Sequence, residues 1–142
     1  MRTLALNFEV DTIALACGAP GHVLSAVFDV NSIETLLDGL TELFLAYKPQ
    51  RVLLNGDRSP AMADIETWLA DRGHAFTRMP EGAVTEMTDA LTTGAADLDI
   101  VDGPALFENC RPGEDRALAA LELDHRLVEW SADQLRQSGA YV

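Results

Sequence analysis

The sequence predicts an α/β fold in which a three-stranded antiparallel meander is followed by alternating helices and strands. Its first thirty residues hold three apolar segments, 3–10, 12–17 and 22–30, separated by turn residues. Short apolar segments bounded in this way are typical of strands. After residue 30 apolar residues recur at intervals of three and four, which indicates amphipathic helices. We expect a mixed central sheet with helices packed on it, in a single domain over 1–142.

The three predicted strands differ in how their side chains alternate. In the first, large apolar residues alternate with a face that includes Asn7 and Glu9. The second has small residues on one face, which suits a helix packed closely on the sheet. The third is apolar on both faces, so we expect it to be buried on both sides.

The remaining elements follow from caps, breakers and periodicity. Ser59 and Pro60 are typical of a helix start, and Gly73 of a helix end. The expected order after the meander is a helix over 33–47, a strand over 51–55, a helix over 59–73, a strand over 75–79, a weaker helix over 81–94, a short strand over 97–101 and a last helix over 114–137.

Composition limits the partners and the compartment. The net charge is −13, with 23 acidic and 10 basic residues, and such a charge repels phosphate backbones at long range. We therefore expect another protein as partner, for which a basic surface would be complementary, with a homodimer as a further option and nucleic acid disfavoured. No apolar run is long enough to span a bilayer and no signal peptide is apparent, which predicts a cytoplasmic protein without membrane insertion. Cys17 and Cys110 have no metal-binding or redox spacing, so we expect free thiols.

Two stretches resemble a known superfamily. Residues 1–7, running into 12–16, resemble the opening hairpin of RuvC/YqgF-type nucleases and of actin-like proteins. Residues 47–57 (YKPQRVLLNGD) resemble the passage from a helix into the central strand of those proteins. The continuation, 59–70, is similar to actin-like subunits of type IV pilus and type II secretion assembly platforms. The resemblance covers residues 1–80 and implies a ribonuclease H-like fold.

One function that the resemblance implies is a metal-dependent nuclease. Such a site needs clustered carboxylates that hold two divalent metal ions. The resemblance places one acid in the middle of the first strand, where this chain has Asn7, another at the end of the fourth strand, and more on the last helix. The candidate ligands of Mg²⁺ are Glu9, Asp57, Glu114 and Asp115. Asn7 is a poor metal ligand because its amide brings no charge.

A nucleotide-binding ATPase is a second function of the superfamily. The first turn, Val10-Asp11, has no glycine that would let backbone amides approach a phosphate. The actin-like architecture also closes two such domains around the nucleotide, and this chain has room for one. ATP hydrolysis by this chain alone is therefore disfavoured.

The third function is a noncatalytic protein-protein interaction or scaffold module, as part of a secretion or pilus-type assembly. It accounts together for Asn7, for the missing phosphate loop and for the acidity. Leu127 and Trp130 lie off the apolar stripe of the last helix and are the candidate interaction residues, unless they cover the rim of the sheet. We expect this function, with no catalytic residues and no cofactor, and keep the Mg²⁺-dependent nuclease as the alternative.

Overall fold

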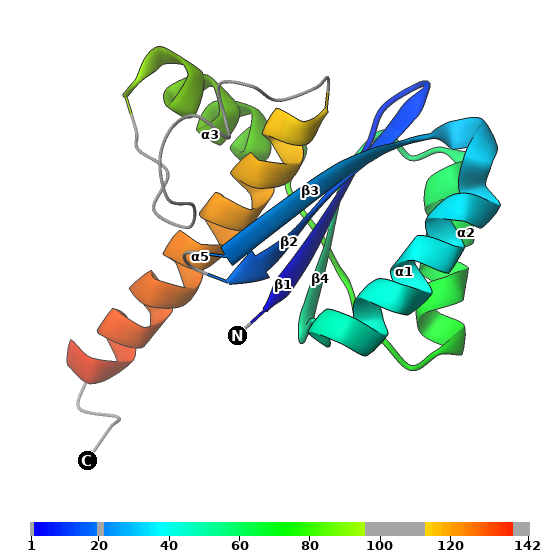
Figure 1. Ribbon diagram of the computed structural model, residues 1–142. Coiled ribbons are helices and arrows are strands. Elements are labelled where there is room, and N and C mark those ends of the chain that lie inside the picture. Colours follow the sequence, from blue (N-terminus) through cyan, green and yellow to red (C-terminus); the bar gives the residue numbers. More distant parts are fainter. Residues whose placement is uncertain (1, 20–21, 96–112, 138–142) are drawn as a thin grey trace.

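A five-stranded mixed sheet forms the centre of the protein (Figure 1). The computed structural model describes residues 2–19, 22–95 and 113–137. The strands are β1 (Thr3–Phe8), β2 (Thr12–Ala19), β3 (His22–Asp29), β4 (Arg51–Gly56) and β5 (Thr77–Arg78). Their order in the sheet is β3-β2-β1-β4-β5, in which β1, β2 and β3 form an antiparallel meander. β4 lies parallel to β1 and to β5, so the carboxyl ends of β1 and β4 lie at the same end of the sheet.

Helices cover both faces of the sheet. The helices are α1 (Ile33–Tyr47), α2 (Pro60–Asp71), α3 (Glu81–Thr93) and α5 (Glu114–Gln137), and a single 3₁₀ turn, η1 (Val30–Ser32), leads from β3 into α1. α1 and α2 lie on one face, whereas α3 and α5 lie on the other (Figure 1). The protein therefore has three layers, with β1 buried at the centre.

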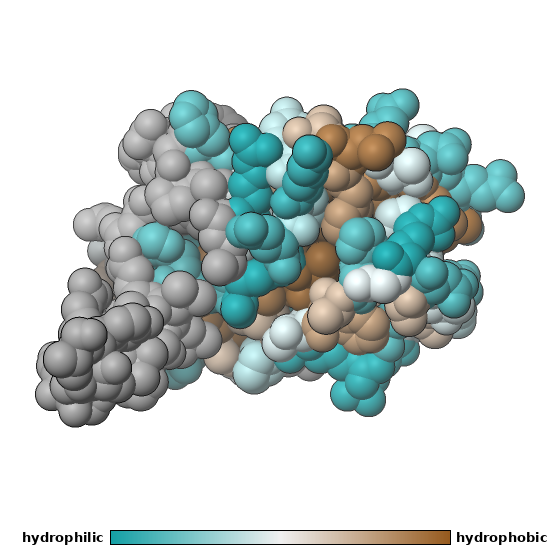
Figure 2. All heavy atoms as spheres, turned by 90° about the horizontal axis from the view of Figure 1, so that it is seen from below, coloured by the Kyte–Doolittle hydropathy of each residue, from teal (hydrophilic) through white to brown (hydrophobic). Residues whose placement is uncertain are grey.

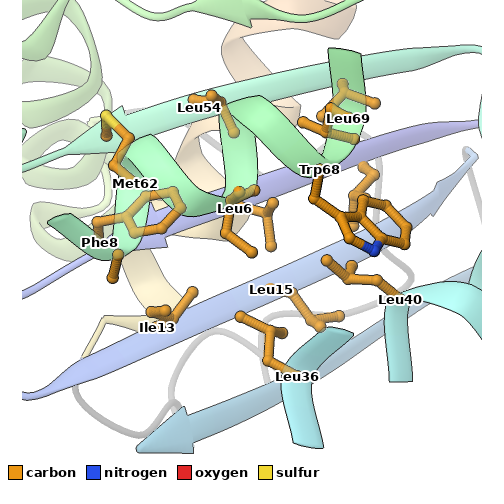
Figure 3. Close-up of a cluster of buried hydrophobic side chains, with 14 of the residues drawn as sticks. Leu6, Phe8, Ile13, Leu15, Leu36, Leu40, Leu54, Met62, Trp68 and Leu69 are labelled. Carbon is orange, nitrogen blue, oxygen red and sulfur yellow. The ribbon is translucent and has the colours of Figure 1, made fainter. Parts of the chain in front are cut away.

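The face under α1 and α2 carries large side chains. Because successive strand residues point to opposite faces, the large apolar residues of β1 and β2 and alternate residues of β4 gather on this side, where they meet the two helices (Figure 3). This cluster includes Leu6, Phe8, Ile13, Leu15, Leu36, Leu40, Leu54, Met62, Trp68 and Leu69. Helix α2 begins as the sequence predicts, with Pro60 in its first turn and the Ser59 hydroxyl accepting a hydrogen bond from the Met62 amide at 3.3 Å.

The opposite face carries small side chains and lies against α5. Its members include Ala5, Ala14, Ala16, Leu53, Val84, Ala117, Leu118, Ala120 and Leu121. Alanine on both the sheet and the helix lets the backbone of α5 approach closely. The start of β4 is tied to the middle of α5 by two hydrogen bonds from the Arg51 guanidinium to the Asp124 carboxylate, at 2.5 and 3.1 Å.

The predicted fold class is confirmed, and several details differ: β1 ends at Phe8 rather than at residue 10, and β2 extends to Ala19 rather than ending at residue 17. β3 is half-buried rather than buried on both faces, because it is an edge strand with a neighbour on one side only. The strand expected over 75–79 is limited to Thr77–Arg78. The strand expected over 97–101 falls outside the described residues. Within those residues, no helix has the length and the apolar character that crossing a bilayer requires.

Candidate functional site

Two asparagines lie side by side beneath the start of α5. Asn7 of β1 and Asn55 of β4 are directly paired in the parallel register of the two strands. Both side chains are buried, with residue exposures of 0% and 2%. The Asn55 Nδ2 donates a hydrogen bond to the Asn7 Oδ1 at 2.7 Å. An amide pair thus occupies the end of the sheet where the resemblance places two acids.

Glu9 sets the direction of this hydrogen-bond chain. The Asn7 Nδ2 donates to the Glu9 Oε1 at 2.9 Å, and an ionised carboxylate can only accept. Asn7 must therefore turn its Oδ1 toward Asn55, and Asn55 must present its Nδ2 in return. The Asn55 Oδ1 is left buried with no hydrogen-bond partner, a state that disfavours folding by about 1–3 kcal/mol.

The first turn of α5 closes over the amide pair. Gly113, which precedes the helix, has a φ of +91°, and a Cβ there would lie 3.4 Å from the Asn7 Nδ2 and 3.4 Å from the Glu9 Cγ. One turn later the Arg116 Nε lies 3.8 Å from the Glu9 Oε1. Both of these charged side chains are more than a third exposed, at 38% and 39%. The polar chain therefore runs from buried Asn55 through Asn7 and Glu9 to Arg116 at the surface.

The metal ligands that the sequence predicts lie around this series of hydrogen-bonded side chains, but they do not come together as one group. Glu114 is buried, and its Oε2 accepts a hydrogen bond from the Ser25 Oγ of β3 at 2.5 Å. The Asp115 Oδ1 accepts from the Arg116 backbone amide at 2.8 Å. Asp57 is exposed, and its backbone amide donates to the Phe8 carbonyl at 2.9 Å. Among the described residues, no three His, Cys, Asp or Glu side chains form a group that could hold a metal ion.

The predicted interaction residues cannot be compared in the same way. Leu127 and Trp130 belong to α5, but their side chains fall outside the described part of the chain. The proposal that they contact a partner stays a prediction. The thiol of Cys17, by contrast, is described: it is free and buried in β2, and burial raises its pKa to about 11.

The donor set does not fit a pair of divalent cations. Asn7 and Asn55 are neutral, and the charge of Glu9 is balanced by Arg116, so these four side chains carry a formal charge of zero. The Asn7 Oδ1 is already occupied by its hydrogen bond with Asn55. Two Mg²⁺ ions need several carboxylates to offset their charge and fill their coordination shells. The role of Asn55 is the feature that sequence reasoning missed, although a polar residue at the end of an apolar strand was its signal.

A groove lies at the opposite end of the sheet, where α1 and α2 end. It has a volume of about 420 Å³ and is lined by Thr41, Phe44, Leu45, Lys48, Pro49, Trp68, Arg72 and His74. Inside it Phe44 stacks on His74 with ring centroids 4.1 Å apart, and the Arg72 guanidinium lies 4.2 Å from the Trp68 ring. Figure 2 views the protein from this end and shows apolar surface between hydrophilic side chains. Lys48 and Arg72 directly follow the two helices, where positive charge offsets the helix dipole.

Comparison with known proteins identifies the fold. No protein-family model matches the chain, and no curated protein does. Among solved structures, the chain is similar to Thermus thermophilus RuvC in complex with a Holliday junction substrate, with a TM-score of 0.61 at 12% identity over 84% of this chain and 88% of that one. It is also similar to the fowlpox virus Holliday junction resolvase, with a TM-score of 0.53 at 13% identity over 91% and 98% of the two chains.

These similarities overturn the expectation about nucleic acid that was drawn from the net charge. A protein of the same fold is bound to a DNA junction in its solved structure, so the expectation that nucleic acid is disfavoured was wrong. Net charge sums over the whole surface, whereas binding depends on the local field where the ligand docks. The preference for a protein partner with a basic surface rested on the same charge and loses its support. The chain has the ribonuclease H-like fold of the RuvC resolvases.

Proposed function

We propose that this protein binds branched DNA at the end of the sheet where β1, β4 and the start of α5 meet. The observation that carries the proposal is the extent of its likeness to the junction-bound RuvC. That likeness covers 84% of this chain and 88% of the other, so it includes the helix layers as well as the sheet. A shared sheet alone would be weaker support, because one fold serves many functions.

The chemistry of this end of the molecule is compatible with a phosphate backbone. Arg116 is partly exposed on the first turn of α5, and Arg58 is exposed in the segment between β4 and α2. The amino end of a long helix adds backbone amides and a partial positive charge, both of which favour phosphate. Glu114 is buried against Ser25 rather than facing solvent, whereas exposed Asp57 at the same end opposes a phosphate.

A metal-dependent nuclease is the second candidate. The observation in its favour is that Glu9, Asp57, Glu114 and Asp115 all lie near the same end of the sheet, on a fold shared with resolvases. Against it stands Asn7, a neutral and buried amide at the position where the resemblance places an acid. Binding and cleavage are therefore separate questions, and one assay can answer both.

The test uses a fluorescently labelled four-way junction and a duplex of the same length. Binding is followed by fluorescence anisotropy at about 50 mM salt, where phosphate contacts are strongest, and the same samples with Mg²⁺ or Mn²⁺ are run on a denaturing gel. We expect tighter binding to the junction than to the duplex. Absence of binding to either DNA would contradict the proposal. Cut strands that disappear in Glu114→Gln would establish the nuclease instead.

A further inference from the structure

The polar chain at this site ends in a guanidinium where the fold leads one to expect metal ions. We propose that Arg116, and not a divalent cation, contacts the DNA phosphate here, and that Glu9 is the counter-ion that the phosphate displaces. The inference rests on the proposed DNA binding. It concerns how the phosphate is held, and it predicts binding that needs no metal.

The side chains of the hydrogen-bonded series carry no net charge that would attract metal ions. The amide pair is neutral, and Glu9 and Arg116 cancel one another. A two-metal centre brings four positive charges, for which these side chains offer no compensation. The unpaired Asn55 Oδ1 is a single neutral acceptor buried inside the site, and the facing oxygen of Asn7 is committed to a hydrogen bond. These four side chains therefore supply no net negative charge to a metal ion, and their surface group is itself a cation. Of the acids nearby, Glu114 is hydrogen-bonded to Ser25 and Asp115 accepts from the Arg116 backbone amide.

Arg116 lies where a phosphate can reach it. Gly113 has no side chain, so the start of α5 lies directly on Asn7 and Glu9, and Arg116 comes within 3.8 Å of the Glu9 carboxylate. A partly exposed ion pair of this length is weak, because water competes for both groups. A phosphate accepts two parallel hydrogen bonds from a guanidinium and also gains from the helix amino end. Phosphate is therefore the stronger partner for Arg116 when DNA is present.

Glu9 has two separable roles. Its carboxylate accepts from Asn7, which orders the amide pair, and it neutralises Arg116 in the free protein. A glutamine at this position keeps an acceptor oxygen for Asn7 and loses the charge. Glu9→Gln should therefore leave the amide pair in place and free Arg116 for DNA.

The experiment measures junction binding by the full chain in EDTA and in Mg²⁺ at equal ionic strength. The variants are Arg116→Ala, Arg116→Lys and Glu9→Gln. The controls are Arg78→Ala and Glu66→Gln, since Arg78 and Glu66 form another arginine–glutamate ion pair, closer and hydrogen-bonded, that involves α2 on the other face of the sheet. Circular dichroism and thermal unfolding establish that each variant is folded.

We expect equal affinity in the two buffers. Arg116→Ala should weaken binding about tenfold and lower the slope of log affinity against log salt by about one. Arg116→Lys should retain part of the affinity because it keeps the charge but not the bidentate geometry. Glu9→Gln should strengthen binding about two- to fivefold, which is the loss of a weak competing ion pair. Both controls should stay within about twofold, as expected for residues remote from the contact.

Each other result would overturn the inference. Binding that requires Mg²⁺, an Arg116→Ala variant no weaker than Arg78→Ala, or a Glu9→Gln variant that fails to bind more tightly would each do so, while leaving DNA binding itself established. If the wild-type chain binds no junction in either buffer, the proposed function fails and the inference fails with it. Should Arg116→Ala not fold, the salt slope of Arg116→Lys and the affinity of Glu9→Gln decide the question.

Discussion

The Asn55 Nδ2 donates to the Asn7 Oδ1 at 2.7 Å across the parallel strands β4 and β1. The two side chains are buried, and their direction is fixed by the Glu9 carboxylate on the far side of Asn7. This contact is the centre of the candidate site, and its energetics can be measured without any knowledge of the ligand.

Removing one member of the amide pair should destabilise the protein. In Asn7→Ala both the Nδ2 and the Oδ1 of buried Asn55 are left without a partner, so the free energy of unfolding should fall by about 1–3 kcal/mol. Urea denaturation followed by circular dichroism measures the change. Asp57→Ala, at an exposed position two residues after Asn55, is the control and should shift stability by less than about 0.5 kcal/mol. Equal effects of the two substitutions would contradict a structural role for the pair.

Replacing Asn7 with an acid should create a pH-dependent defect. Asn7→Asp places a second carboxylate against Glu9, whose Oε1 now lies 2.9 Å from the Asn7 Nδ2. Like charges raise the pKa of the pair in the folded state above its unfolded value, so the folded variant binds more protons than the unfolded one. Its stability relative to wild type should therefore be nearly normal near pH 4 and lower by about 2 kcal/mol at pH 7. Denaturation at the two pH values tests this, and a defect that is larger in acid would rule the explanation out.

Gly56, which ends β4, should tolerate alanine far less well than Gly73. Both residues have a positive φ, +103° and +74°. A Cβ on Gly56 would lie 2.2 Å from the Phe8 carbonyl oxygen, whereas one on Gly73 would meet nothing within 4 Å. Gly73→Ala should lower stability by about 1 kcal/mol through backbone strain alone, and Gly56→Ala by more than about 3 kcal/mol because β1 must move. Thermal unfolding of the two variants gives the comparison, and similar values would show that β1 gives way easily.

Sequence reasoning located the elements better than the site. The strands and helices could be predicted because Ser59, Pro60 and Gly73 act locally, and because the period of apolar residues reports the face that each element buries. The candidate site depends on register. Nothing in either segment alone shows that Asn7 of β1 pairs with Asn55 of β4, since parallel pairing is set by the connecting helix and the packing of the whole sheet.

Contacts between distant segments also decide why the predicted metal ligands do not form one group. The resemblance implied acids in the first strand, at the end of the fourth strand and on the last helix. It could not show that Glu114 turns to Ser25, or that Arg116 rather than an acid approaches Glu9. The amide at position 7 was noticed as a poor ligand, but its partner lies 48 residues away in the chain.

The thiol of Cys17 should be unreactive in the folded protein. Burial raises its pKa from 9.0 to about 11, so the reactive thiolate is scarce near neutral pH. In a Cys110→Ser background, which leaves Cys17 as the single thiol, reaction with a disulfide reagent at pH 8 should be slow in buffer and fast in denaturant. Rapid modification of the native protein would contradict the buried position.

The same shift makes stability depend on pH in the alkaline range. Because the folded pKa lies above the unfolded value, the contribution of the thiol is complete below pH 9 and is lost between about pH 9 and 11 as the unfolded chain deprotonates first. Cys17→Ala should therefore show a shallower loss of stability in this range than wild type, by roughly 1–3 kcal/mol. Parallel curves for the two proteins would refute the assignment.

The position of Asn55 directly before Gly56 has a consequence for the chemical lifetime of the protein. In a flexible chain an Asn-Gly sequence deamidates readily, because the glycine nitrogen attacks the asparagine side-chain carbonyl and expels ammonia. Here the packing of Gly56 against Phe8 requires the glycine, while strand pairing and the hydrogen bond to Asn7 hold the Asn55 amide in place. Deamidation would set a carboxylate oxygen against the Asn7 Oδ1, where a donor is needed. The site is thus protected from chemical ageing only while the sheet stays closed, and every opening of β4 exposes it to an irreversible change.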